Sequence, residues 1–526
     1  MARIASTYPV FSQAWDEPAH VACGLEWWAR GTTTCDPTHP PLARVVNAAP
    51  LYFAGLRPMP GANEIAEGND ILHAGGHYFR NLALARAGSL VFYVLACWWV
   101  YALARRVFSS VVGVVSVLLF SSLPAILHVG SLAYTDMAVV AFLVWFVHRW
   151  LLWLEEATPA RAAWLGISAG AAIGSKYSAI PYIALLAAAS VAVLLARRLS
   201  IPRAASRLTG NWKLALVCVL ACTITLWAVF HFAVAPLSPL VGRHPGIDRF
   251  LVPGTLASRI AYGALETPVP LSGLVSGIAA LASFNRGFEA AGEPYYFLGA
   301  VRTSGVWHYF PMVLLCTLPI GFLLMLPGGF VKVARREIIL CLAPLAVMAT
   351  NMVANLTYAP RHLTPAYPFL SILAVVFLVT LWQSTRLPLL ARPLAILLAG
   401  AHLAASVAAH PDYHAFSNAL QRLLPPVTLA DMGKDVARLS RECQQRNIPF
   451  LHVAIEGSND LSRMGLPPFT PLEPYRRTAG WIAISEHKLK IHHPRSPPYD
   501  GYAWLEACTP VTRVGASIRL YHIGPH

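Results

Sequence analysis

The sequence predicts a polytopic α-helical membrane protein with about ten transmembrane segments and a small C-terminal α/β domain. Of its 526 residues, 56% are hydrophobic and only 12% are charged, which is untypical of a soluble domain. Apolar stretches recur from residue 82 to 409, whereas charge increases and apolar runs become shorter from about residue 410 onward. We therefore divide the chain into residues 1–81, 82–409 and 410–526.

Residues 1–81 contain no apolar stretch of transmembrane length and no signal peptide. We interpret this Pro- and Gly-punctuated segment as the first periplasmic loop, and it carries the adjacent carboxylates Asp16 and Glu17. On a helix, neighbouring side chains point about 100° apart. We therefore expect one carboxylate to act as a base and the other to bind or orient. The alternative is a charge pair at the start of a helix.

Ten apolar stretches follow this segment, and several are short for a bilayer of about 30 Å, so that some helices are expected to be tilted or broken. They are residues 82–104, 109–129, 136–154, 163–175, 177–196, 213–235, 308–327, 337–355, 365–382 and 388–409. The run from 163 to 196 is too long for one span and has basic residues at both ends. We expect it to be a hairpin that turns near Lys176.

The orientation follows from basic residues in alternate loops, which are expected to be cytoplasmic. These residues are Arg105, Arg106, Arg149, Arg161, Arg197, Arg198, Arg203, Arg207, Lys213, Lys332, Arg335, Arg336, Arg386 and Arg392. The Asp16 loop, the turn before Asp136, the loop 236–307 and the tail then share the outer face. Because topology explains the basic residues, we expect no nucleic-acid partner.

Several cations on the outer side are candidates for phosphate binding. His39 precedes Pro40 and Pro41, which stiffen the segment that also carries Arg44; an interfacial loop anchor is the alternative. Arg86 lies inside an apolar stretch, where a charge costs a few kcal/mol unless it reaches the interface or meets an anion. A lipid phosphate would be a natural partner for Arg86.

Asp136 begins an apolar stretch at its outer end, where it is either a functional acid or an ordinary helix cap. Lys176, Arg361 and His362 are further outer cations, with contact to lipid headgroups as the plain alternative. His20 lies near the carboxylates and could complete a cation site, so a divalent metal stays an open alternative. The sequence indicates no other cofactor.

Five cysteines, Cys97, Cys218, Cys222, Cys316 and Cys341, lie in apolar stretches and are expected to be packing residues. Cys23 and Cys35 share the first outer loop, and Cys443 and Cys508 share the tail. Each pair is either a disulfide in an oxidising compartment or two free thiols.

The tail from residue 410 has the pattern of an α/β domain. Residues 429–446 have helical spacing, and residues 450–455, 480–484 and 517–522 have the pattern of strands.

The motifs of the chain, taken in order, resemble those of a known family. They are Asp-Glu at 16–17, His-Pro-Pro-Leu at 39–42, Tyr-Thr-Asp-Met at 134–137, Gly-Ser-Lys-Tyr at 174–177, Gly-Val-Trp-His-Tyr-Phe-Pro at 305–311, Arg-His-Leu-Thr-Pro-Ala-Tyr-Pro at 361–368, Asp-Met-Gly-Lys-Asp at 431–435 and Gly-Trp-Ile-Ala-Ile-Ser at 480–485. The chain resembles the bacterial GT-C glycosyltransferases of the family 39 type, which include relatives of the protein O-mannosyltransferases and the lipid A aminoarabinose transferases.

The resemblance implies roles for individual residues. Asp16 matches the catalytic base and Glu17 its acidic neighbour, while Asp136 matches a second acid of the cavity. Arg86 matches a donor-phosphate ligand, and His39 stands where the aminoarabinose transferases have a Lys. We assign Lys176 and Arg361 to the donor phosphate as well, with His20, Arg44 and His362 as additional candidates.

The chain departs from the family pattern at two positions. Members have a transmembrane helix before the Asp-Glu loop, whereas here fifteen residues precede Asp16. We therefore expect the gene to encode a further apolar segment upstream. Cys316 stands where many bacterial relatives have a Lys, which removes one phosphate contact.

The resemblance implies a bacterial inner-membrane enzyme that moves a sugar, with inversion, from a polyprenyl-phosphate-linked donor to a hydroxyl of a protein, lipid or glycan in the periplasm. The donor phosphate needs a cation, and the acceptor hydroxyl needs a base. The competing interpretation is a transporter or flippase for a lipid-linked or anionic substrate. Against it, the two halves show no internal repeat, and the carboxylates cluster in a loop.

Overall fold

The computed structural model describes residues 1–196, 212–237, 255–256, 263, 265–353, 360–429, 431–493 and 497–525. Three regions used in the topology prediction therefore lie wholly or partly outside the described residues. They are the basic loop at 197–211, much of the loop 236–307 and the start of the segment 355–364.

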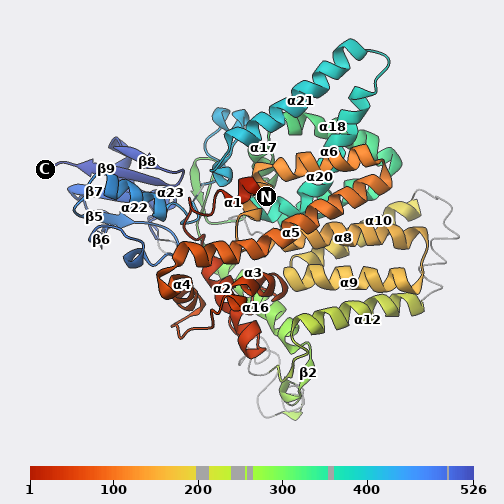
Figure 1. Cartoon of the computed structure of the whole chain (residues 1–526), viewed down its shortest axis with the longest axis horizontal. Coiled ribbons are helices and arrows are strands. Elements are labelled where there is room, and N and C mark those ends of the chain that lie inside the picture. The colour runs from red at the N-terminus through yellow and green to blue at the C-terminus, as the bar shows by residue number, and fades with distance from the viewer. Residues whose placement is uncertain are drawn as a thin grey trace.

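Long apolar helices lie side by side and form most of the molecule (Figure 1). They coincide with the predicted apolar stretches, because each buries an apolar face against its neighbours. The helices are α5 (Tyr78–Val107), α6 (Ser110–Ser122), α7 (Pro124–Gly130), α8 (Asp136–Glu155), α9 (Pro159–Ser175), α10 (Ala179–Ala196), α12 (Trp212–Val229), α17 (Tyr309–Thr317), α18 (Ile320–Arg336), α19 (Ile338–Val353), α20 (Tyr367–Trp382) and α21 (Pro388–Ala408).

The number of membrane spans differs from the prediction. Within the described residues, five helices are long and apolar enough to cross a membrane, or up to seven if each of two bent pairs forms one span. The pair α6 and α7 bends by 71° and the pair α17 and α18 by 118°. Prolines at the breaks explain the bends, since Pro124 begins α7 and Pro319 precedes α18. The expected total of about ten spans is not confirmed.

The predicted hairpin within residues 163–196 is confirmed. Helix α9 ends at Ser175 and α10 begins at Ala179, so the turn contains Lys176.

Residues 1–81 are more helical than a loop. They form α1 (Ala2–Ala5), α2 (Glu17–Arg30), α3 (Leu42–Phe53), α4 (Glu64–His73) and the 3-10 turn η1 (Ala74–Gly76). Pro18 lies in the first turn of α2, where its missing N–H costs nothing, and Gly31 ends the helix with a φ of 66°. Cys23 and Cys35 form a disulfide, which ties α2 to the segment before α3.

Among the described residues between α12 and α17 are two short antiparallel strand pairs and helix α16. β1 (Val234–Ala235) pairs with β2 (Val269–Pro270), and β3 (Tyr295–Phe297) pairs with β4 (Ala300–Arg302). Helix α16 (Ser272–Ala291) lies between β2 and β3 in the sequence.

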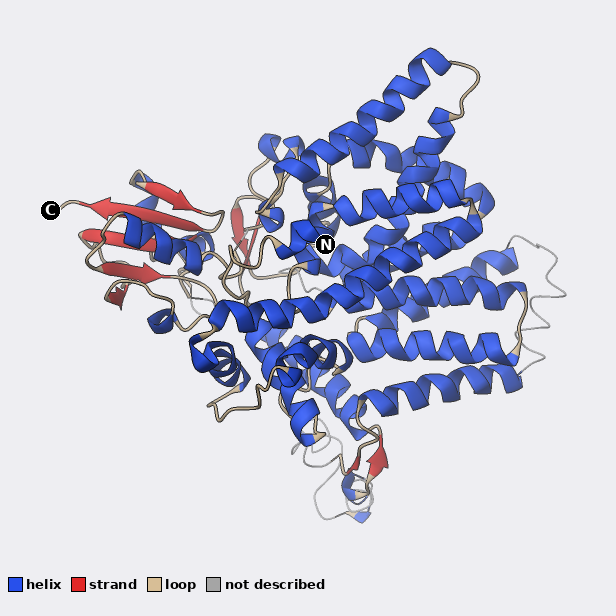
Figure 2. Ribbon diagram, in the orientation of Figure 1, coloured by secondary structure: helices blue, strands red, loops and turns tan. Residues whose placement is uncertain are grey.

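The tail contains a five-stranded mixed sheet, which lies at one end of the long helices (Figure 2). Its strand order is β6 (Phe469–Pro471), β5 (Leu451–Ala454), β7 (Gly480–Ser485), β9 (Ile518–Ile523) and β8 (Thr512–Val514). β5 is parallel to β6 and β7, whereas β9 is antiparallel to both of its neighbours. The three predicted strands are β5, β7 and β9.

Helices and 3-10 turns complete the tail. Helix α22 (Val436–Gln445) buries Leu439 and Cys443 against the sheet, and its amphipathic pattern is the one that predicted a helix at 429–446. The other elements are η3 (Tyr413–Ala415), η4 (Ala419–Leu423), η5 (Leu461–Arg463), α23 (Glu486–Lys490) and η6 (Ala503–Ala507). Cys443 and Cys508 are free thiols. The domain boundaries after residues 81 and 409 stay predictions.

Candidate active site

Four charged residues from distant parts of the chain meet in one cluster. Asp16 caps the start of α2, Asp136 begins α8, Lys176 follows the end of α9, and Arg361 lies in the 3-10 helix η2 (Pro360–Ala366). Each residue lies at the end of a helix, and the fold gathers these ends in one place.

The charges alternate in sign along the cluster. Nη2 of Arg361 is 3.0 Å from Oδ2 of Asp16, and its Nε is 3.4 Å from Oδ2 of Asp136. Nζ of Lys176 is 2.5 Å from Oδ1 of Asp136. The Asp136 side chain is only 3% exposed, whereas those of Asp16 and Arg361 are 26% and 21% exposed. Asp136 therefore pairs with two cations on the buried side of the cluster, while Asp16 and Arg361 are partly exposed.

Tyr134 contacts two residues of this cluster, Arg361 and Asp16. The Arg361 guanidinium lies 5.0 Å from the centre of the Tyr134 ring, and the Asp16 backbone N–H donates to Tyr134 Oη at 3.1 Å. Burial raises the pKa of Tyr134 well above its ordinary value, so the phenol keeps its proton. Sequence analysis did not select Tyr134, although it stands in the Tyr-Thr-Asp-Met motif that led to Asp136.

A second group of polar side chains lies beside the cluster. His20 contacts both Tyr134 and His39 edge to face, at centroid distances of 5.6 and 5.2 Å. Nδ1 of His39 is 3.2 Å from Oδ2 of Asp36, and Arg44 forms an ion pair with the same carboxylate. Arg44 also donates to His20 Nδ1 at 3.2 Å. This group connects the His39 loop to α2.

Burial and neighbouring charges shift the pKa values of His20 and Asp36 in this second group. Burial, together with the nearby Arg44, lowers the pKa of His20 well below its ordinary value, so His20 is neutral and accepts at Nδ1. Burial alone would raise the pKa of Asp36, but the hydrogen bond from His39 and the charge of Arg44 hold it below its ordinary value. His39 therefore faces a permanent anion.

Asp36 was missed at the sequence level. Its signal is an Asx turn, in which its carboxylate accepts the Thr38 N–H at 2.9 Å. Arg44 is 3% exposed and donates to the carbonyls of Asp36 and His39. The Arg44 guanidinium bonds to groups within the protein, and its place among the additional phosphate candidates stays a prediction. His39 is 31% exposed and stays accessible.

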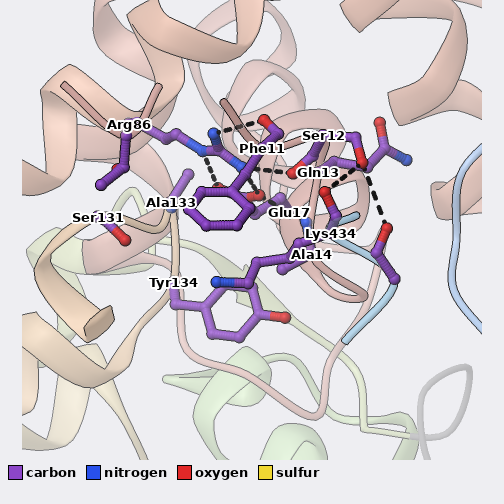
Figure 3. A network of polar contacts seen from close by, with 12 residues as sticks. Phe11, Ser12, Gln13, Ala14, Glu17, Arg86, Ser131, Ala133, Tyr134 and Lys434 are labelled. Carbon is purple, nitrogen blue, oxygen red and sulfur yellow. Dashed lines mark hydrogen bonds and ion pairs between the residues drawn. The ribbon is translucent and has the colours of Figure 1, made fainter. Parts of the chain in front are cut away.

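Glu17 and Arg86 form a buried ion pair with each other (Figure 3). Arg86 donates Nε and Nη2 to the two carboxylate oxygens of Glu17 at 2.9 and 2.8 Å. It also donates to the carbonyls of Phe11 and Ser12. The side chains of Glu17 and Arg86 are 0% and 1% exposed. The anion beside Arg86 in this structure is Glu17, and contact between Arg86 and the donor phosphate stays a prediction.

The Glu17 carboxylate also has all of its hydrogen bonds within the protein. Its carboxylate accepts the backbone N–H groups of Ala14 at 2.7 Å and Ala133 at 2.9 Å, in addition to the bonds from Arg86. This carboxylate thus has four donors and no exposed surface. In this structure Glu17 fixes the segment that ends in Asp16, which agrees with an orienting role for one of the two carboxylates; its assignment as a catalytic residue stays a prediction.

The remaining predictions concern His362 and a metal. His362 follows Arg361 in η2, and its carbonyl accepts from Asn351 Nδ2 at 3.2 Å. Among the residues with described positions, no group of three His, Cys, Asp or Glu side chains could hold a metal ion. His20 bonds to Arg44 in place of the cation site suggested with Asp16 and Glu17.

Comparison with known proteins identifies the class. A family model described as dolichyl-phosphate-mannose-protein mannosyltransferase matches residues 79–227, and no curated protein matches the chain. The match confirms the predicted resemblance to the mannosyltransferase group and identifies the chain as a glycosyltransferase. With its apolar helices, it is a multi-pass membrane glycosyltransferase.

Solved structures of two proteins are similar. ArnT from Cupriavidus metallidurans bound to undecaprenyl phosphate shares 13% identity with a TM-score of 0.49, and the alignment covers 100% of this chain and 97% of ArnT. The oligosaccharyltransferase of Archaeoglobus fulgidus tethered with an acceptor peptide shares 12% identity with a TM-score of 0.42, over 89% of this chain and 58% of that chain. Because both TM-scores are below 0.5, neither structure bears on the chemistry of this chain.

Proposed function

We propose that the protein transfers a sugar, with inversion, from a polyprenyl-phosphate-linked donor to an acceptor hydroxyl at the periplasmic face of the bacterial inner membrane. The observation that carries this proposal is the contact between Asp16 and Arg361. It places an accessible carboxylate beside an accessible guanidinium at one end of the membrane helices. The reaction needs these two groups, a base for the acceptor and a cation for the leaving phosphate.

Asp16 is the proposed base. It is partly exposed, while its neighbour Glu17 is buried and fully bonded. The Asp16 carboxylate accepts the proton of the acceptor hydroxyl as the hydroxyl oxygen attacks the anomeric carbon. The bond between that carbon and the phosphate oxygen breaks on the opposite face, and the polyprenyl phosphate leaves with the bonding electrons.

Arg361 is the proposed principal phosphate ligand, with Lys176 and His39 beside it. A guanidinium offers paired N–H donors that match phosphate oxygens. Asp136 holds Arg361 and Lys176 in place from the buried side. A donor phosphate would compete with Asp16 for Arg361 and so release the carboxylate toward the acceptor, which couples donor binding to base activation.

Two further observations support the donor class and the orientation. The matching family model is named for an enzyme that uses dolichyl-phosphate mannose, which is a sugar linked to a polyprenyl-type phosphate. The Cys23–Cys35 disulfide lies in and next to α2, and disulfides persist in oxidising compartments such as the periplasm. The identities of the sugar and of the acceptor stay outside the proposal.

The proposal is tested by Asp16→Asn, which keeps the size of the side chain but removes proton acceptance. Turnover of a polyprenyl-phosphate sugar should fall by about 100-fold or more, while donor binding survives because Arg361 and Lys176 hold the phosphate. Both quantities are measured on protein purified in detergent, with membrane extract as the source of acceptor. Asp500→Asn, an exposed tail position, is the matched control. Normal turnover in Asp16→Asn would show that Asp16 is not the base, and the absence of sugar transfer by the natural protein would favour the transporter interpretation.

A further inference from the structure

A basic groove lies at the junction between the membrane helices and the tail, apart from the active-site cluster. Its volume is about 890 Å³, and its lining includes Arg80, Arg441 and Arg463 together with His77, Phe79 and Gln444. These residues come from the first turn of α5 and its approach, from α22 and from η5. The groove shares no residue with the cluster around Asp16.

Two of the three arginines keep an unbalanced positive charge. Arg80 is exposed and forms no ion pair with another described residue. Arg441 donates from Nη2 to the Val10 carbonyl at 2.8 Å, and a carbonyl does not neutralise its charge. Arg463 is paired with Asp70 at 2.6 Å. The groove therefore carries a net positive charge suited to an anion.

Arg80 also heads an apolar stripe along α5. Residues four, seven, eleven, fourteen and eighteen positions further along the chain lie on the same helical face as Arg80. They are Leu84, Ala87, Val91, Val94 and Trp98, and Val91, Val94 and Trp98 are exposed. Because α5 is long and apolar enough to cross a membrane, this stripe can face lipid chains, and it leads to the groove at the N-terminal end of α5.

We propose that the groove binds the phosphate of a lipid headgroup, whose acyl chain lies along the Arg80 face of α5. Arg80 and Arg441 supply charge-assisted donors to the phosphate oxygens, and the partly exposed Phe79 contacts the first carbons of the chain. The bound lipid joins the membrane helices to the tail, because Arg80 belongs to α5 and Arg441 to α22. This site is independent of the donor phosphate at Arg361.

The test measures binding of dioctanoyl phosphatidic acid to the full-length protein in detergent. Arg80→Gln and Arg441→Gln should each weaken binding by about tenfold or more, as loss of a charge-assisted hydrogen bond would. Arg105→Gln, an exposed arginine at the other end of the same helix, is the matched control and should bind normally. Equal weakening by Arg105→Gln, or none by Arg80→Gln, overturns the site.

A second arm separates a lipid from free phosphate. Inorganic phosphate should bind at least about tenfold more weakly than phosphatidic acid, because it makes no contact with the apolar stripe. Binding as tight as that of the lipid overturns the assignment to a lipid. Arg80→Gln protein should also keep its unfolding temperature in the absence of lipid, since Arg80 forms no ion pair with any described residue. A lowered temperature would show that Arg80 has a structural role and would overturn the assignment.

Discussion

At the scale of single residues, two adjacent carboxylates have opposite environments. Asp16 is partly exposed and meets Arg361, whereas Glu17 is buried and meets Arg86. Because successive helical side chains point about 100° apart, the start of α2 directs one carboxylate to the open cluster and the other into the protein. In the proposed mechanism, Asp16 therefore acts as the base and Glu17 holds it in position.

Arg86→Met should destabilise the protein more than it affects donor binding. The substitution leaves Glu17 buried without its cation, and breaking such a pair costs about 3–5 kcal/mol. Thermal unfolding in detergent should show a clear loss of stability, while the folded fraction binds the lipid-linked donor with unchanged affinity. The opposite pattern, weakened donor binding at an unchanged unfolding temperature, would show that Arg86 binds the donor phosphate.

Lys434 predicts a dependence of stability on pH. Its side chain is 3% exposed, and burial lowers its pKa from 10.5 to about 7. Between these two values the unfolded chain holds a proton that the folded protein does not, so stability should rise as the pH increases from 7 to 9, by about 2 kcal/mol. Unfolding midpoints measured across this range test the expectation.

Lys434→Met is the matching control for this pH dependence. The variant should be more stable than the natural protein at pH 7 and should lose the rise between pH 7 and 9. A rise of equal size in the variant would assign the effect to another group.

At the scale of elements, α2 is held in place from several sides. Helices α3 and α4 pack against it closely, and the tail loops hold the segment before it. Ser12 donates its N–H to the Lys434 carbonyl at 3.0 Å, and Asn459 Nδ2 donates to the Gln13 carbonyl at 3.4 Å. The position of Asp16 therefore depends on contacts with segments far away in the sequence.

Gly68→Ala tests the packing of α4 on α2. A Cβ atom at Gly68 would lie 2.1 Å from the Pro18 carbonyl oxygen, so the first turn of α2 must move. A displacement of about 1 Å at Asp16 would lower turnover by about 100-fold. Gly400→Ala in α21 is the control, because nothing lies within 4 Å of its Cβ. Equal activity of both variants would show that α2 tolerates the shift.

At the scale of the whole molecule, the tail sheet and the active-site cluster belong to one end of the helix bundle. The chain near the N-terminus bridges them, since Arg441 of α22 donates to the Val10 carbonyl and Arg86 of α5 donates to the Phe11 carbonyl. The tail and the proposed chemistry should therefore share one side of the membrane.

Topology reporters test this arrangement. A reporter that works only outside the cytoplasm, fused after His410, should be active, because we propose that the tail is periplasmic. The same reporter fused after Val107, at the basic end of α5, should be silent. Activity in the reverse pattern would contradict the outward-facing site.

The sequence by itself determined the membrane class, the course of the apolar helices and three strands of the tail. These features depend on hydropathy and on periods of 3.6 and 2 residues, which are local properties of the chain. It also selected Asp16, Asp136, Lys176 and Arg361 as candidates, because charges are rare next to apolar stretches. The tertiary structure brought these four residues together.

Only the tertiary structure decided which charges are partners. Glu17 and Arg86 are 69 positions apart, and Asp16 and Arg361 are 345 apart, so no local pattern could pair them. Residue type shows that a buried charge needs a counter-ion, but whether that counter-ion is a side chain or a substrate depends on the distances that folding creates. For that reason the sequence suggested a phosphate beside Arg86, whereas the structure places Glu17 there. The contacts of Tyr134 and Asp36 with the candidate site residues likewise appear only in the folded chain.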